Sequence, residues 1–461
     1  MTGVTESQFV IDDRITPRFR VHRSALADPA VFEAERRAIF DHSWLYVGHE
    51  SEITSPYDFR TRRVGGRPVI LLRDGDGSVR VFVNTCPHRG MQIETRAEGN
   101  GRFLKCFYHG WSFSTAGELV ALPDEASYGE NFDRHNLCLA QPAQVDSYRG
   151  FVFLSWSTSP GSLLDYLAGA ADYLDLVADQ SDTTMVVSGG THLYAARANW
   201  KLLSENSYDG YHALTTHHRY LAMLKASGKD MARAFGAGVR TDASTVQGRA
   251  LAWDLGHGHA VVGAPDRSRG QNFPLGRDFI SASAAHAQAE RYAHFAQAHG
   301  EDWAARMFGS RNVVIFPNLA IVDLGMGITI RTYDPLSADS MEITAWAIAP
   351  GEDHPELARM RRENFLTFWG PAGLATPDDI EALERCQQGY AARDAAPWTD
   401  ISRGMVRANP LTTDELQMRT FWREWDRRMT GTIHPSEVAV SPRAGRVALP
   451  YDARVQSAGF R

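Results

Sequence analysis

The sequence predicts an α+β protein in which a small all-β domain precedes a larger α/β domain, built on an antiparallel sheet flanked by helices. Residues 64–156 carry short hydrophobic runs separated by Gly- and Asp-rich turns, as at residues 74–78, and this pattern is typical of hairpins. Helix-like segments begin at residue 163, and strand-like runs return at residues 328–335 and 341–350. The 461 residues are enough for two or more domains with sizeable cores.

The composition argues against several classes of function. Hydrophobic residues make up 43% and charged residues 22%, as in ordinary globular proteins, and the net charge of -7 argues against general nucleic-acid binding. The most apolar run, residues 312–330, is interrupted by Pro317, Asn318 and Asp323, so we expect no membrane span there. Four cysteines and an N-terminus without a secretion-signal pattern predict a reducing, cytoplasmic location.

Local signals place the first elements and the domain limits. Residues 28–40 read as a helix with Asp28 as its N-cap and Pro29 in its first turn. An Ala-rich helix over residues 281–299 should end at Gly300. We predict four parts, which are an N-terminal helical segment packed on the larger domain, the β domain, the larger domain and a C-terminal tail (1–44, 45–160, 161–430 and 431–461).

Two short turns in the β domain carry metal-ligand residues. Cys86-Pro-His88 and Cys106-Phe-Tyr-His109 offer two thiolates and two imidazoles. This donor set suits either one closed zinc tetrahedron or a Rieske cluster, in which two Cys bind one iron and two His bind the other. The stiff Pro87, a Gly after each His and the aromatic Trp111 favour the cluster.

A second candidate site lies in residues 199–220. Asp209 and His212 are three apart and share one face of a helix, whereas His217 is five residues from His212, about 140° around an ideal helix. Both imidazoles can therefore reach one metal only if the helix ends or distorts between them. Gly210 and the β-branched Thr215–Thr216 pair favour such a break. His218 is an alternative second ligand.

These motifs together resemble the large (α) subunits of Rieske non-haem iron aromatic-ring-hydroxylating oxygenases, most closely the benzoate/cumate-type branch. CPHRG and CFYHGW look like the two cluster loops of that family, and SENSYDGYHALTTHH looks like its mononuclear-iron segment. The resemblance implies a Rieske domain at 45–160 and a helix-grip-like catalytic domain at 161–430. It also implies a [2Fe–2S] cluster on Cys86, His88, Cys106 and His109, and Fe(II) on His212 and His217.

The resemblance also supplies the third iron ligand. It places a carboxylate after the turn in FWGPAGLATPDD, and its alignment selects Asp379. Two His and one carboxylate form a facial triad that leaves positions open for O₂. Acidic residues are also favoured in the first turn of a helix, so Asp378 and Asp379 could both have that structural role. Asp378 is the better candidate for interacting with the helix dipole.

The implied reaction is cis-dihydroxylation of an aromatic ring, with an aromatic carboxylate as the first candidate substrate. O₂ is the co-substrate, and the electrons come from NAD(P)H. No GxGxxG fingerprint follows a strand, so NAD(P)H and flavin should bind a separate reductase, with or without a ferredoxin. The family also implies a homotrimeric α core, as α₃ or with a small β subunit as α₃β₃. There Asp209 bridges His109 of the neighbouring subunit and His212 of its own.

Several interpretations stay open. Asn206 matches a family position that faces the substrate, and Arg331 is a candidate for pairing a carboxylate, although an exposed strand Arg is an equal reading. A Rieske monooxygenase or demethylase would share every metal ligand. A Rieske electron carrier would lack the second iron, and a zinc-binding module would lack both iron centres. His257 and His259 are read as polar residues of a strand, and the basic residues near the cluster loops as a solvated face or a docking site for an acidic donor (Arg89, Arg96, Arg102 and Lys105).

Overall fold

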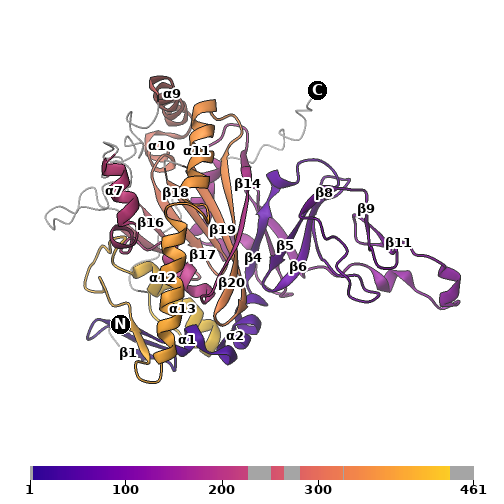
Figure 1. Cartoon of the computed structure of the whole chain (residues 1–461), viewed down its shortest axis with the longest axis horizontal. Coiled ribbons are helices and arrows are strands. Elements are labelled where there is room, and N and C mark those ends of the chain that lie inside the picture. The colour runs from indigo at the N-terminus through magenta and orange to yellow at the C-terminus, as the bar shows by residue number, and fades with distance from the viewer. Residues whose placement is uncertain (1–3, 227–250, 264–280, 325–326, 437–461) are drawn as a thin grey trace.

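The computed structural model describes residues 4–226, 251–263, 281–324 and 327–436. A small β-rich part projects from a larger part in which helices cover a long sheet (Figure 1). No helix in the described ranges is long and apolar enough to cross a membrane. The α+β class predicted from the sequence is confirmed.

The larger part is organised around an antiparallel sheet of seven described strands, in the order β14-β20-β19-β18-β17-β16-β15. Alternate residues of its two long central strands point to opposite faces. Ile328, Ile330 and Ile348 face a core shared with the small part, whereas Arg331 and Ala345 face the other side. The strands are β14 (Met185–Ala196), β15 (Leu251–Gly256), β16 (His259–Gly263), β17 (Arg311–Ile315), β18 (Leu319–Leu324), β19 (Gly327–Ser337) and β20 (Ser340–Pro350).

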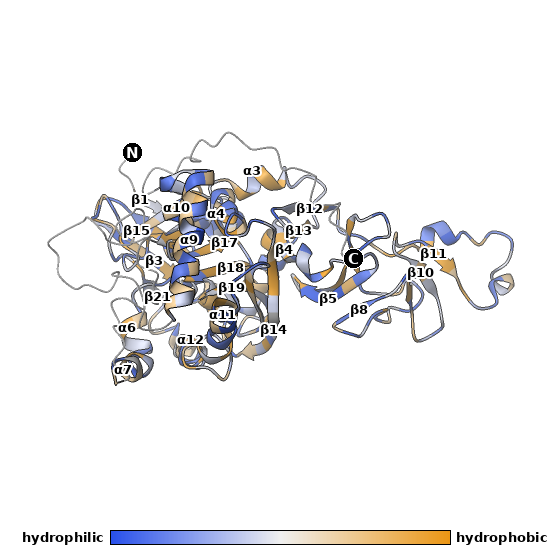
Figure 2. Ribbon diagram, turned by 90° about the horizontal axis from the view of Figure 1, so that it is seen from above, coloured by the Kyte–Doolittle hydropathy of each residue, from blue (hydrophilic) through white to orange (hydrophobic). Residues whose placement is uncertain are grey.

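Helices cover the second face of this sheet. α11 contacts β19, β20 and β14, α12 contacts β14, and α13 crosses β15 and β16. The strands of the sheet are mainly hydrophobic, whereas the helices that cover it carry many hydrophilic residues. Figure 2 shows this contrast between the orange strands β17 and β18 and the blue segments of α9. The main helices are α3 (Leu163–Leu167), α4 (Ala170–Ala178), α5 (Trp200–Asn206), α6 (Ala213–Thr216), α7 (His218–Ala226), α9 (Ala282–His299), α10 (Glu301–Met307), α11 (Pro355–Thr367), α12 (Thr376–Gly389) and α13 (Leu416–Thr430). Gly300 caps α9 as predicted.

The small part contains three short antiparallel sheets. One of them, in the order β12-β13-β4, joins the larger part because its aromatic residues pack in the core beneath β19 and β20. The other two sheets hold the cysteine- and histidine-bearing loops. The strands are β4 (Trp44–His49), β5 (Asp58–Val64), β6 (Arg67–Arg73), β7 (Val79–Val83), β8 (Glu98–Asn100), β9 (Phe103–Lys105), β10 (Ser112–Ser114), β11 (Leu119–Ala121), β12 (Gln144–Tyr148) and β13 (Phe151–Ser155).

The N-terminal segment is less helical than the sequence predicted. Asp28 does cap α2 (Pro29–Glu35), accepting a hydrogen bond of 2.8 Å from Ala30 N, and α1 (Ser24–Ala27) precedes it. Before these helices, however, three strands form a sheet with a strand from far down the chain. They are β1 (Val4–Glu6), β2 (Val10–Asp13) and β3 (Arg18–His22), which pairs with β21 (Trp398–Asp400). This pairing has no local sequence signal, because the partner strand is distant.

A buried carboxylate ties the N-terminal segment to the larger part. Glu35, which has no exposed surface, accepts hydrogen bonds from Lys201 Nζ and from Trp425 Nε1, the latter at 2.7 Å. Its second oxygen accepts from Trp200 Nε1 at 2.9 Å. The side chains of Glu35 and Lys201 are both fully buried, so each charge compensates the other at this junction of α2, α5 and α13.

We predict that Lys201→Met destabilises the protein by about 3–5 kcal/mol, because it leaves a buried carboxylate without its counter-charge. Urea unfolding followed by tryptophan fluorescence measures the change. Lys225→Met, on an exposed lysine of α7, is the matched control and should change the unfolding free energy by less than about 0.5 kcal/mol. A loss below 1 kcal/mol in Lys201→Met would contradict the role given to the pair.

Candidate metal centres and active site

The two loops of the small part have the same backbone geometry. In the first, Cys86 N donates to Met91 O at 2.8 Å and Gly90 N donates to Cys86 O at 2.9 Å. In the second, Cys106 N donates to Trp111 O at 2.8 Å and Gly110 N donates to Cys106 O at 3.0 Å. Gly90 and Gly110 have φ values of 74° and 73°, a conformation that L side chains rarely adopt. The repeated pattern presents one Cys and one His from each loop.

The two loops bring their cysteines close to each other and their histidines close to each other. The His88 and His109 rings lie 4.5 Å apart between centroids, and His88 stacks on Trp111 at 4.9 Å with an interplanar angle of 7°. Both thiols are buried, and burial, followed by the neighbouring Cys106, raises the pKa of Cys86. A pair of buried thiols and a pair of adjacent imidazoles fit the split ligand set of a Rieske cluster. All four cysteines lie among the described residues, and none of them forms a disulfide.

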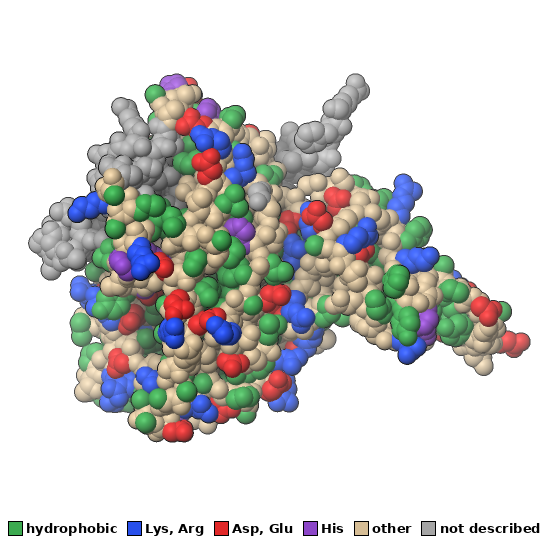
Figure 3. Space-filling view, viewed as in Figure 1, with side chains coloured by type: hydrophobic (Ala, Val, Ile, Leu, Met, Phe, Trp, Pro, Cys, Tyr) green, Lys and Arg blue, Asp and Glu red, His purple; other side chains and the backbone are tan. Residues whose placement is uncertain are grey.

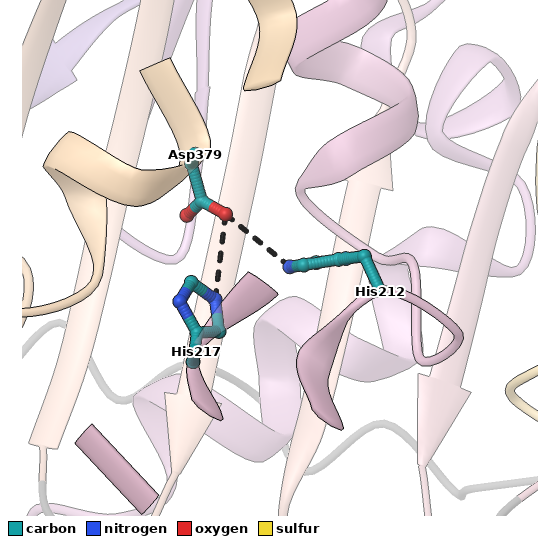
Figure 4. Close-up of side chains that lie close together, drawn as sticks. All are labelled: His212, His217 and Asp379. Atoms are coloured by element: carbon teal, nitrogen blue, oxygen red, sulfur yellow. Dashed lines mark ion pairs between the residues drawn. The ribbon is translucent and has the colours of Figure 1, made fainter. Parts of the chain in front are cut away.

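A second set of ligands lies on the helix-covered side of the sheet. His212, His217 and Asp379 offer ligand atoms that all lie within 4.8 Å of one another. Asp379 Oδ1 is 3.3 Å from Nε2 of each histidine, so the three side chains surround one point, as Figure 4 shows. Two neutral imidazoles and a carboxylate on one side of a metal are the donor set of a facial triad.

The helix breaks as the spacing of the histidines requires. α5 ends at Asn206, and the single turn of α6 separates His212 from His217, whose φ and ψ of -94° and 24° leave the helical range. Gly210 makes the intervening bend fit, because a Cβ there would lie 2.8 Å from Thr412 Oγ1. The two imidazoles therefore face Asp379 from opposite ends of one turn.

Charges in this triad are strongly coupled. Burial acts against the charged form of His212, but hydrogen bonds with Asp209 and Asp379 raise its pKa to about 10. Burial favours neutral Asp379, yet the hydrogen bond from His212 and the charges of both histidines lower the pKa of that carboxyl. A metal cation at the centre would take the place of the proton on His212 and balance the same carboxylate.

Neighbouring side chains hold the triad in position. Asp209 Oδ2 lies 3.2 Å from His212 Nδ1 and its other oxygen accepts from Tyr211 N at 2.7 Å. Asn206 Nδ2 donates to Asp379 Oδ1 at 3.2 Å. These contacts fix the orientation of a ligand ring and of a ligand carboxylate, which is the usual task of groups behind metal ligands.

The structure separates the two acidic candidates of α12. Asp379 is 7% exposed and lies between the histidines, whereas the side chain of Asp378 is 36% exposed and its carboxylate is 3.8 Å from His217 Nδ1, beyond hydrogen-bond distance. Arg331 is 5% exposed, so its reading as an exposed strand residue is wrong. His218 turns away from the triad, with Nδ1 3.0 Å from Thr215 O.

Two other histidines have structural surroundings. His259 is fully buried, its Nδ1 accepts from Phe316 N at 2.9 Å, and its Nε2 lies 2.7 Å from Tyr166 O. His257 occupies the turn between β15 and β16, with φ of 52°, and does not project from a strand as predicted. The sequence interpretation missed His192 and Tyr194, whose buried ring nitrogen Nδ1 and hydroxyl have no hydrogen-bond partner in the described structure. Their alternation in β14 was the available signal.

Comparison with known proteins supports the assignment of the two candidate metal centres. Residues 43–148 match the Rieske [2Fe-2S] domain, and residues 174–431 match the catalytic domain of the ring hydroxylating alpha subunit. The toluate 1,2-dioxygenase α subunit of Pseudomonas putida is 34% identical, over 84% of this chain and 82% of that protein. The 2-halobenzoate 1,2-dioxygenase large subunit of Burkholderia cepacia is 31% identical, over 86% and 83%. The anthranilate 1,2-dioxygenase large subunit of Acinetobacter baylyi is 32% identical, over 84% and 80%.

A solved structure agrees with these relatives. Naphthalene 1,2-dioxygenase with indole bound in its active site superposes with a TM-score of 0.76 at 26% identity, covering 89% of this chain and 92% of that one. The family match spans both candidate metal centres, so the cofactors expected from the sequence, a Rieske [2Fe–2S] cluster and a non-haem iron, are confirmed. The chain belongs to the α subunits of Rieske ring-hydroxylating dioxygenases.

Proposed function

We propose that this chain is the oxygenase component of a multicomponent system that cis-dihydroxylates an aromatic carboxylic acid. The observation that carries the proposal is the His212, His217 and Asp379 triad in a chain that also presents paired Cys/His loops. Three relatives are named for the aromatic acids toluate, 2-halobenzoate and anthranilate, which supports the substrate class. Both atoms of O₂ enter the ring as hydroxyl groups. NAD(P)H gives up a hydride on a separate reductase and becomes NAD(P)⁺, and the two electrons and the proton of that hydride, with one further proton, complete the two hydroxyl groups, so atoms and electrons balance.

The residues divide the work between two centres. Cys86, Cys106, His88 and His109 hold the cluster, and His212, His217 and Asp379 hold the iron. When bound, these groups relay single electrons and activate O₂ beside the substrate. Asn206 orients the Asp379 carboxylate and Asp209 orients the His212 ring, because each hydrogen-bonds an atom of the ligand itself. We also assign Asn206 and Arg331 to substrate binding.

We infer that electrons cross between subunits through Asp209. Within one chain the cluster loops lie in the projecting part, away from α12 (Figure 1). Asp209 already contacts His212 and its side chain is 17% exposed, so one edge is available to His109 of a neighbouring copy. The loop exposes Phe107, 88% accessible, and Tyr108, 50% accessible, and the Tyr108 ring contacts Arg89 at 5.1 Å and the His109 ring at 3.8 Å. Hydrophobic, basic and His side chains gather on the projecting part in Figure 3.

Electron transfer between subunits requires an oligomer and an external electron donor. We propose a homotrimeric α core, α₃ or α₃β₃, that receives electrons from a reductase or from a ferredoxin. The four free thiols suit a reducing cytoplasm. We keep the domain limits 1–44, 45–160, 161–430 and 431–461 as proposed units.

Product analysis with ¹⁸O₂ tests the reaction class. We expect both atoms of one O₂ molecule in a cis-dihydrodiol acid, formed from a benzoate-type substrate with reductase and NADH. A product that carries a single labelled hydroxyl, or a loss of a methyl group as formaldehyde, would assign the chain instead to the monooxygenase or demethylase alternative. Gas chromatography with mass spectrometry of the product separates these outcomes.

We predict that Asp379→Ala loses the mononuclear iron and all ring hydroxylation but keeps the cluster, because the triad then has no carboxylate. Iron and sulfide analysis should fall from three to two irons per chain, with the Rieske EPR signal intact. Asp378→Ala is the matched control on the same helix turn and should retain three irons. Full iron content in Asp379→Ala would remove that residue from the ligand set.

We predict that Asp209→Asn keeps both metals but lowers coupled turnover by roughly 10–100-fold, because the amide cannot accept hydrogen bonds from two imidazoles as the carboxylate does. Stopped-flow reoxidation of the reduced cluster in the presence of substrate and O₂ should slow in proportion. Unchanged reoxidation and unchanged turnover would exclude Asp209 as the bridge.

A further inference from the structure

Four buried polar atoms without a hydrogen-bond partner gather on one side of the catalytic sheet. They are Arg331 Nε, His192 Nδ1, Tyr194 Oη and Thr329 Oγ1. Buried polar atoms are nearly always paired, so each exception calls for a physical reason such as a ligand. Their grouping on two strands indicates one shared reason.

The strand register places these residues together. His192 on β14 and Arg331 on β19 both pair with Ala345 of the strand between them, so the three share a row across the sheet. Tyr194 lies two residues from this row on one side, opposite Ile343, and Thr329 lies two residues from it on the other side, opposite Ala347, so all four side chains are on one face with Arg331 and His192 in the middle. Ala345 and Ala320 flank Arg331 in its row, so no long side chain stands directly beside the guanidinium.

Arg331 is a buried cation without a counter-ion. The residue is 5% exposed, its Nε has no hydrogen-bond partner, and within the described ranges no carboxylate lies within ion-pair distance of it. Arg311 on β17 shows the usual arrangement, since it is equally buried but lies 3.1 Å from Asp323. Burying an unpaired charge costs several kcal/mol. An anion bound beside Arg331 would therefore offset the cost of burying its charge.

This cation lies near the iron ligands. Ala345 lies between Arg331 and His192 in the sheet, and the His192 ring stacks on Phe365 at 4.0 Å. Ala345 also belongs to an apolar cluster with Phe365 and Phe368, and the Phe368 ring lies 6.3 Å from that of His217. Apolar surface therefore links the unpaired polar atoms to the metal centre.

We propose that Arg331, Tyr194 and His192 form one anion subsite that binds the carboxylate of the aromatic acid and directs its ring along the apolar cluster towards the iron. This inference rests on the aromatic-acid function proposed above and deepens it. The guanidinium supplies charge and a planar fork, and the phenol and imidazole supply two further donors.

The donors are held in place before any ligand arrives. The His192 ring stacks on Phe365 at 4.0 Å with an interplanar angle of 1°, and a Cβ at Gly370 would lie 3.3 Å from its Cε1. Burial keeps Tyr194 protonated by raising its pKa, so its hydroxyl remains a donor. Groups fixed in this way lose little freedom when they bind a carboxylate.

A comparison of benzoate with nitrobenzene, its uncharged isostere, tests the subsite in the holoenzyme. Isothermal titration under nitrogen measures both dissociation constants without turnover. We expect the wild type to prefer benzoate strongly and Arg331→Met to weaken benzoate binding roughly 100-fold. We expect Tyr194→Phe to weaken it roughly tenfold or more, with nitrobenzene within about twofold of wild type.

Tyr333→Phe is the matched control, because this tyrosine lies on the same sheet face but its hydroxyl is already 3.0 Å from Ser204 Oγ. It should leave the benzoate preference unchanged. The Rieske EPR signal and iron content report folding of each variant, and Arg331→Lys, which keeps the charge but loses the fork, replaces Arg331→Met where that protein does not fold.

The outcomes separate the two proposals. A benzoate affinity that falls in the Arg331 variants but stays within twofold in both Tyr194→Phe and His192→Phe overturns the three-residue subsite and leaves the aromatic-acid function standing. Wild-type protein that binds benzoate no better than nitrobenzene overturns the subsite and the acid substrate class together. A dihydrodiol formed from a neutral arene would then retain the dioxygenase reaction itself.

Discussion

The meeting of one carboxylate oxygen with two imidazoles is the contact on which the catalytic part depends. Asp379 Oδ1 lies 3.3 Å from Nε2 of both His212 and His217. The carboxylate comes from the first turn of α12, whereas the histidines flank α6, far earlier in the chain. The interruption of the helix after α5 and the close passage of Gly210 by Thr412 are the local adjustments that allow this meeting. A metal cation bound between the three side chains would compensate the negative charge of the buried Asp379 carboxylate.

The sheet beneath the triad has two different faces. On one, Ile328, Ile330 and Ile348 form a dry core with aromatic residues of the small part. On the other, the same strands carry Thr329, Arg331 and alanines, and the site lies on this face. Strand alternation lets a single element supply stability on one side and unpaired polar groups on the other. The apolar face offsets the cost of leaving those groups without partners until a ligand binds.

The two metal centres differ in how they are built. The cluster site needs two loops with identical hydrogen bonding, each complete within six residues from Cys86 to Met91 and from Cys106 to Trp111. The iron site needs segments of the chain that only the packing of α12 against β14 and α5 brings together. The ligands of the cluster are therefore positioned by local loop geometry, whereas the iron ligands are positioned by the packing of the whole catalytic part.

The sequence by itself determined the α+β class, the cluster loops, the caps at Asp28 and Gly300 and the need for a helix break near His212, because these depend on residue types and short spacings. Resemblance added Asp379. Only the tertiary structure decided that Arg331 is buried, and that His192 and Tyr194 lie on the same sheet face. The N-terminal strands were missed because β3 pairs with β21 from the far end of the chain. Burial, facing and pairing between distant segments arise from packing, and no local pattern encodes them.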